Sequence, residues 1–195
     1  LFRSNAFALS GQAKIDGSSL YYKYYKNSHA PFKGTIIFQN GSGTPLNEWT
    51  YNKQFFRCVK QLGSVFLYDR SGLGKSPPNL ALSSQNPMTV KLINDRWEEL
   101  LKKVHVKEPY IVVSHSYGGL YAGYFARKNP QWVEGMVMVD PVPRDYYWSK
   151  KLLQSHHVTM SELHQMEKLS TPVLYQKYSL EKAEHNHSMS AQLLF

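Results

Sequence analysis

Residues 110–119 read Tyr-Ile-Val-Val-Ser-His-Ser-Tyr-Gly-Gly, and this stretch decides the fold. Its apolar, β-branched start predicts a buried strand, and a helix is predicted to follow over Leu120 to Arg127. Ser116 therefore stands on a short turn between a strand and a helix. Such a turn strains the backbone and brings the flanking chains together, so the residues two positions before and after must be small. Ser114 and Gly118 satisfy that need.

On both sides of this stretch, strand and helix patterns alternate along the chain. Short apolar runs predict strands at five places, namely 20–26, 35–39, 65–68, 110–113 and 133–139. Tyr51, Phe55, Val59 and Leu62 recur at helical spacing, and a second amphipathic helix is predicted over 90–104. Apolar strands separated by amphipathic helices favour an α/β fold with a mostly parallel central sheet and helices on both faces.

Four predicted loops follow the carboxyl ends of these strands. They begin at Gln39, Asp69, Ser114 and Asp140. Ligands of open parallel sheets bind outside the carboxyl ends of the strands. We therefore expect the functional residues at this edge.

Length and composition indicate one globular domain over residues 1–195. Apolar residues make up 42% of the chain and charged residues 19%, and no apolar run approaches the length of a membrane span. The net charge of +9 comes mostly from lysines spread along the chain without a nucleic-acid-binding motif, so no nucleic-acid partner is predicted. The single cysteine, Cys58, excludes an internal disulfide and leaves cytoplasmic and exported locations open.

The segment 141–170 departs from the alternating pattern. It contains Tyr146, Tyr147 and Trp148, and it is predicted either as a cap or lid within the domain or as aromatic packing against the core.

Because the sequence begins at Leu1 and not at Met, we expect a trimmed start or one inside a longer gene product.

The sequence contains no complete motif for phosphate, dinucleotide or metal binding. Gly74-Lys75-Ser76 resembles the end of a phosphate loop, but Asp69 stands where that loop requires glycine. Gly41-Ser42-Gly43 resembles a dinucleotide loop, but Leu46 occupies the third glycine position. The sequence has neither an HExxH motif nor a Cys/His cluster, and the pair His156-His157 is expected to be exposed. No cofactor and no metal are therefore predicted.

Four blocks in order along the chain resemble the α/β-hydrolase superfamily, in its lipase, esterase and peptidase-like branch. They are the stretch studied above, Ser114–Gly119, together with Phe38–Gly43, Tyr68–Ser76 and Met138–Pro141. The resemblance covers about residues 12–143 and implies an α/β-hydrolase fold with a small cap. The segment that normally follows the strand at 172–175 is missing here, so the fold is expected to be incomplete in this chain.

The resemblance implies a nucleophile and an oxyanion hole. Ser116 matches the nucleophile, and the backbone amides of Ser42 and Tyr117 match the donors that stabilise the oxyanion. Asn40 replaces the usual histidine before Gly41, a change expected to affect loop packing more than mechanism.

The base and the acid of the triad are assigned by family order, which runs serine, acid, histidine. The end of the chain resembles the family's histidine loop and selects His187, with His185 second and a plain polar tail as the alternative. Asp140 is the expected acid, and the alternative is an acid in the missing segment. Weaker acid candidates lie in the cap, namely Asp145, Glu162 and Glu167.

Three residues near the motifs are expected to be structural. His115 points to the opposite side of the turn from the nucleophile, so it is expected to pack and not to serve as the base. Asp69 and Arg70 are expected to tie down their own turn.

The sequence thus predicts a serine hydrolase that cleaves carboxylic esters through an acyl-enzyme on Ser116, with a small-molecule or lipid-like ester as substrate. The aromatic cap favours an apolar group. A peptidase of the same fold would use the same residues, and a non-catalytic binding protein of this fold is the alternative from another class. Dehalogenase chemistry is disfavoured because it uses Asp where Ser116 stands.

Overall fold

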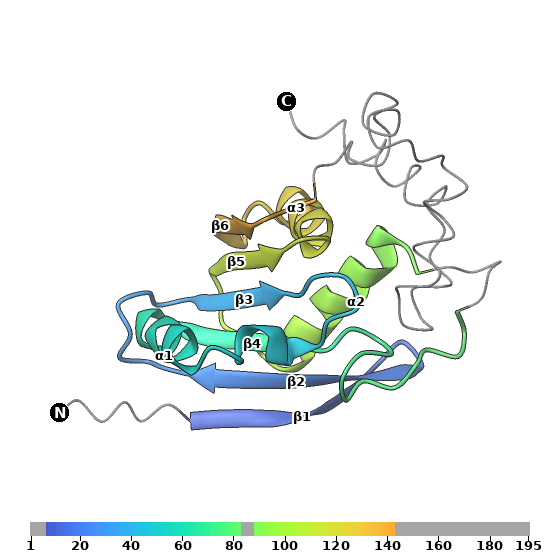
Figure 1. Ribbon diagram of the computed structural model, residues 1–195, viewed down its shortest axis with the longest axis horizontal. Helices are drawn as coiled ribbons and strands as arrows, with labels where there is room; N and C mark the ends of the chain where they lie inside the picture. Colours follow the sequence, from blue (N-terminus) through green and yellow to red (C-terminus); the bar gives the residue numbers. More distant parts are fainter. Residues whose placement is uncertain (1–6, 83–87, 143–195) are drawn as a thin grey trace.

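The computed structural model describes residues 7–82 and 88–142, which form one sheet with helices on both faces (Figure 1). The six strands lie in the order β1-β2-β4-β3-β5-β6. The first two run antiparallel to each other, β2 runs antiparallel to β4, and the other neighbours are parallel. The strands are β1 (Phe7–Ile15), β2 (Ser18–Lys26), β3 (Thr35–Gln39), β4 (Ser64–Tyr68), β5 (Tyr110–His115) and β6 (Val133–Val139). The predicted α/β fold with a mostly parallel sheet is confirmed.

The helices begin at polar caps that the sequence supplies. Helix α1 (Lys53–Leu62) follows Asn52, whose side chain accepts a hydrogen bond from the Phe55 amide at 3.0 Å. Thr89 plays the same part for α2 (Val90–Lys103), accepting from the Leu92 amide at 3.1 Å. The remaining helices are the short 3-10 helix η1 (Leu46–Trp49) and α3 (Gly118–Lys128).

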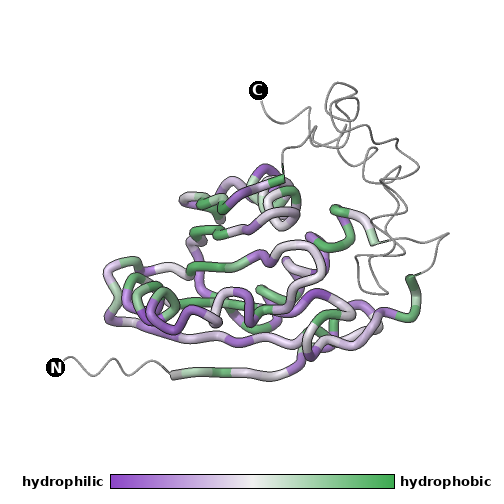
Figure 2. The backbone as a smooth tube through the Cα atoms, viewed as in Figure 1, coloured by the Kyte–Doolittle hydropathy of each residue, from purple (hydrophilic) through white to green (hydrophobic). Residues whose placement is uncertain are grey.

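Successive residues of the central strands point into two different apolar cores. On the face that α1 covers, Ile36 and Phe38 of β3 pack with Phe56 and Val59. On the opposite face, Ile37 packs with Trp97 of α2 and Phe125 of α3, among others. Figure 2 shows the resulting apolar stretches along β3 and β5. This burial on both faces explains why the strands are apolar throughout.

Two details differ from the sequence-based expectations. Tyr51 was assigned to the first helix, but it precedes α1 and is 91% exposed, and Phe56 and Val59 form the buried side of that helix. Strand β1 was not foreseen, because its sequence Phe-Ala-Leu-Ser-Gly-Gln-Ala-Lys-Ile has few β-branched residues. Its full-length pairing with β2 makes it a strand.

The parallel register brings the predicted functional loops to one edge of the sheet. Gln39 at the end of β3 lies opposite Ser114, and His115 at the end of β5 lies opposite Val139. The loops after β3, β5 and β6 therefore leave the sheet side by side, as predicted.

An open apolar groove remains on the α1 face, within the described residues. Its volume is about 490 Å³, and Phe55, Val137 and Val139 are among its lining residues.

The predicted cap at 141–170 lies outside the described residues apart from its first two positions, so the structure does not test it. In residues 7–82 and 88–142, no helix combines the length and the apolar character that a membrane crossing needs.

Trp97 provides a test of the core that supports the sheet. Its side chain is fully buried, its ring centroid lies 4.4 Å from that of Phe125, and its indole N–H has no partner among the described residues. We expect Trp97→Ala to lower the free energy of unfolding by about 3–5 kcal/mol. Trp97→Phe should lower the free energy of unfolding less, because a phenyl ring still fills much of the site and the indole N–H had no hydrogen bond to lose. Urea denaturation of both variants checks this, and equal losses would contradict it.

Candidate active site

The turn at Ser116 has a strained backbone. Its φ is 49°, in the left-handed region that residues other than glycine rarely adopt. The Ser116 amide donates to the Val139 carbonyl at 3.1 Å, and the Ser116 carbonyl accepts from the amides of Gly119 and Val142 at 3.0 and 3.1 Å. Helix α3 begins at Gly118, so the positive end of its dipole lies at this turn. The sequence-predicted strand–turn–helix at Ser116 is present in the structure.

The close approach that requires small residues around the turn is also present. A Cβ at Gly118 would lie 2.5 Å from the carbonyl oxygen of Asn40 and 2.6 Å from that of Gln39. Ser114 is completely buried on the other side of the turn. The start of α3 thus rests directly on the backbone that leaves β3, with no room for a side chain between them.

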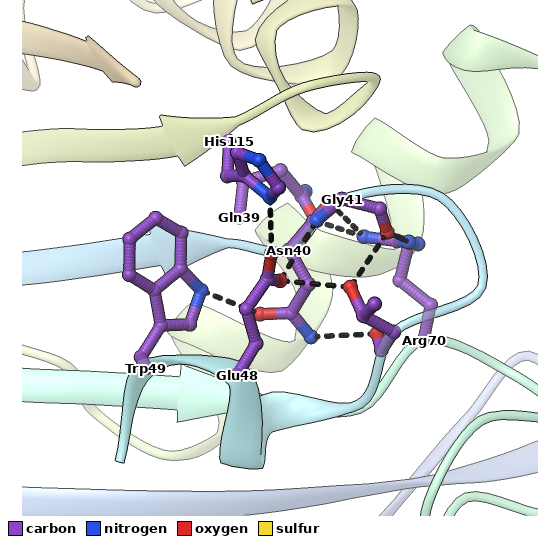
Figure 3. Close-up of polar contacts among 8 residues, drawn as sticks. Gln39, Asn40, Gly41, Glu48, Trp49, Arg70 and His115 are labelled. Carbon is purple, nitrogen blue, oxygen red and sulfur yellow. Dashed lines mark hydrogen bonds and ion pairs between the residues drawn. The ribbon is translucent and has the colours of Figure 1, made fainter. Parts of the chain in front are cut away.

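The β3 loop, residues 40–45, is held from the core side by Arg70. This guanidinium is 2% exposed and donates to the carbonyl oxygens of Asn40 at 2.7 Å and Gly41 at 2.5 Å (Figure 3). It also donates to the Gln39 side chain at 2.8 Å. The neighbouring Asp69 accepts from the Leu46 amide at 2.6 Å. The expectation that Arg70 and Asp69 are structural agrees with these contacts, which tie down the β3 loop as well as their own turn.

Asn40 fixes the same loop through its side chain, in the position where the family usually has histidine. Its Oδ1 accepts from the Trp49 indole at 2.9 Å (Figure 3). Its Nδ2 donates to the Tyr68 carbonyl at 3.1 Å. The Asn40 side chain thus packs the loop against η1 and the end of β4.

These contacts determine where the Ser42 amide points. The Gly41 carbonyl and the Ser42 N–H belong to one planar trans peptide unit, so they point in opposite directions. The carbonyl is directed at Arg70, which is buried, whereas Ser42 is exposed. The Ser42 N–H therefore points away from Arg70.

His115 makes a contact that the sequence did not reveal. Its Nδ1 pairs with Oε1 of Glu48 in η1, and its ring meets Trp49 edge-on at 6.4 Å between centroids (Figure 3). The expected packing role of His115 is therefore incomplete. Glu48 belongs to no motif and lies 67 residues away in the chain, so no sequence signal identified it.

Asp140 follows β6 and lies beside the Ser116 turn. Its neighbours Val139 and Val142 are both hydrogen-bonded to the Ser116 backbone, and Asp140 itself is exposed with a φ of 43°. The other predicted triad residues fall outside the described residues, namely His187, His185, Asp145, Glu162 and Glu167. The structure thus brings Ser42, Ser116, Tyr117 and Asp140 to one edge and leaves the base untested. The described part of the chain contains no cluster of three or more metal-ligating side chains.

Comparison with known proteins places this site in a family. The family model Hydrolase_4, described as serine aminopeptidase, S33, matches residues 31–193. The chain belongs to this family of α/β-hydrolases. Uncharacterized protein YqjL of Bacillus subtilis is 36% identical over 131 residues, which cover 67% of this chain and 47% of that protein. Mouse monoglyceride lipase is 25% identical over 127 residues, which cover 65% of this chain and 41% of the lipase. The chain thus spans about half the length of these relatives.

Solved structures show the same fold. Mouse alpha/beta hydrolase domain-containing protein 10 superimposes with a TM-score of 0.64 and 21% identity, covering 92% of this chain and 70% of that one. VinJ superimposes with a TM-score of 0.62 and 15% identity, covering 93% of this chain and 59% of that one. These structural similarities show that the chain has an α/β-hydrolase fold.

Two glycines of α3 test the close approach at the turn. Gly118→Ala should lower the free energy of unfolding by about 1–3 kcal/mol, because its methyl group overlaps two backbone oxygens that cannot move aside. Gly123→Ala is the matched control, since its Cβ would meet only the mobile end of Arg127 at 3.3 Å. The control should be neutral or stabilising by up to about 1 kcal/mol. Thermal and urea unfolding measure both, and similar losses would argue against the overlap.

Proposed function

We propose that this chain is a serine hydrolase that cleaves carboxylic esters through an acyl-enzyme on Ser116. The observation that carries the proposal is the left-handed backbone at Ser116, held on a strand–helix turn directly against the β3 loop. Strained backbone in a residue other than glycine concentrates at functional sites. Membership of a hydrolase family supports the same reading.

In the proposed mechanism, the Ser116 oxygen attacks the acyl carbon while His187 takes the hydroxyl proton. The negative charge on the substrate oxygen is stabilised by the Ser42 and Tyr117 amides, each worth on the order of 10²–10³ in rate. His187 then gives its proton to the departing alcohol. Water, deprotonated by His187, attacks the acyl-enzyme and releases the acid and free Ser116.

Asp140 is the proposed orienting acid. A carboxylate that accepts from the histidine base fixes its tautomer and stabilises its charged form. The hydrogen bonds on both sides of Asp140 keep its backbone beside the Ser116 turn, which supports the assignment. The alternative is an acid in the segment that the resemblance identifies as missing from this chain.

The relatives support two substrate classes. Mouse monoglyceride lipase, by its name, acts on esters with an apolar acyl chain, which supports a small-molecule or lipid-like ester. The family description names a serine aminopeptidase, which supports peptide hydrolysis as the second candidate. The same Ser116 would act in ester and in peptide hydrolysis. Faster turnover of p-nitrophenyl butyrate than of aminoacyl p-nitroanilides would therefore support the esterase, and the reverse would support the peptidase.

The nucleophile is tested by covalent labelling. A fluorophosphonate probe should label the full chain, and Ser116→Ala should abolish both labelling and ester turnover. Ser10→Ala, which removes an exposed hydroxyl from β1, is the control and should behave as the unaltered chain does. An unaltered chain that neither labels nor turns over ester would favour a non-catalytic binding protein of the same fold.

The base and the acid are tested by two further substitutions. His187→Ala should lower kcat by at least about 10³-fold, because the serine then lacks its proton acceptor. Asp140→Asn should lower kcat by up to about 10⁴-fold. His185→Ala is the matched control for the histidine loop and should keep most of the activity. Loss of activity in His185→Ala with retention in His187→Ala would reverse the assignment of the base.

A further inference from the structure

The carboxylate of Glu48 joins two segments that the proposed chemistry needs in a fixed relation. Its Oε2 accepts from the Gly41 amide at 2.9 Å and from the Thr44 hydroxyl at 2.8 Å, both in the β3 loop. Its Oε1 contacts Nδ1 of His115, the residue immediately before Ser116. Figure 3 shows the carboxylate between the loop and the end of β5.

The pair lies directly against the backbone of Gly41. A Cβ at that position would be 2.9 Å from Nδ1 of His115 and 3.3 Å from Oε1 of Glu48. A side chain at position 41 would therefore have to displace His115 or Glu48.

Gly41 is thus fixed at both of its peptide groups. Glu48 accepts from its N–H, and Arg70 donates to its C=O from the opposite, buried side. With both ends held, the following peptide unit has one orientation, and its N–H belongs to Ser42. That amide is the proposed oxyanion donor.

Placing a carboxylate here to accept from the Gly41 amide and the Thr44 hydroxyl has a desolvation cost. The Glu48 side chain is only 16% exposed, so its charge is partly desolvated, and this desolvation has a free-energy cost. In exchange, the carboxylate connects the β3 loop to His115, the residue before Ser116.

We propose that Glu48 and His115 are positioning residues that orient the Ser42 amide relative to Ser116. The catalytic part of this inference rests on the proposed hydrolase function, while the orientation itself does not. Neither residue touches the reacting atoms.

The orientation is tested without any substrate. In Glu48→Gln and His115→Gln, amide NMR of the full chain should show displaced Gly41 and Ser42 resonances, and the Gly41 amide should exchange with solvent at least about tenfold faster. Glu99→Gln, an exposed carboxylate of α2, is the matched control and should leave both resonances in place. Unchanged Ser42 resonance and Gly41 exchange in both folded variants would overturn the inference.

Kinetics supply the second readout. Glu48→Gln should lower kcat for p-nitrophenyl butyrate by about 10–100-fold with KM within about twofold, because a misaligned donor loses part of its transition-state effect. The double variant Glu48→Gln/His115→Gln should lose no more than the worse single variant, since the two residues act as one unit. Equal losses in kcat for Glu99→Gln, or none in Glu48→Gln, would refute the catalytic part.

The two proposals fail in different ways. Absence of Ser116-dependent turnover in the unaltered chain refutes the hydrolase function, and the NMR measurements still decide the orientation. If Glu48→Gln lowers the melting temperature by more than about 8 °C, His115→Gln decides alone, because it keeps the carboxylate and removes only the link to β5.

Discussion

Where α3 begins, the chain passes over the end of β3 with no side chain between the two backbones. The carbonyl oxygens of Gln39 and Asn40 lie so close to Gly118 that even a methyl group would overlap them. This contact forces the chain to leave β5 and enter α3 within a very short turn. Ser116 takes up the bend with a left-handed backbone, which costs about 1–3 kcal/mol in a residue other than glycine. The strained turn and this backbone contact thus occur together at the start of α3.

The loop on which α3 rests must be equally rigid, and buried polar groups make it so. Arg70 is almost completely buried, and a buried guanidinium is costly unless acceptors satisfy it. Gln39, Asn40 and Gly41 each supply an acceptor to it, so movement of the loop would break hydrogen bonds to a buried charge. The two apolar cores on the faces of the sheet offset the strain and the desolvation at its edge.

Much of this arrangement was predictable from local patterns. The bounds of β3 and β6 follow from β-branched runs, and the turn at Ser116 follows from small residues between a strand and a helix. Strand β1 was not predictable in this way, because pairing with β2 and not its own composition makes it a strand. Glu48 was missed for a related reason. Its significance lies in contacts with Gly41 and His115 that only the folded chain brings together.

Under the proposed function, the contacts of Arg70 and Glu48 with Gly41 would prepare one peptide unit for an oxyanion before any substrate arrives. A donor that must turn toward the charge as it forms spends part of its stabilising energy on that rearrangement. Here a buried cation draws the Gly41 carbonyl inward, while a partly buried anion holds its N–H from the other side. Opposite charges on opposite sides of one glycine leave its peptide groups a single orientation. The ordering cost is met when the chain folds, and the same anion extends the restraint to His115, the last residue of β5 and the one before Ser116.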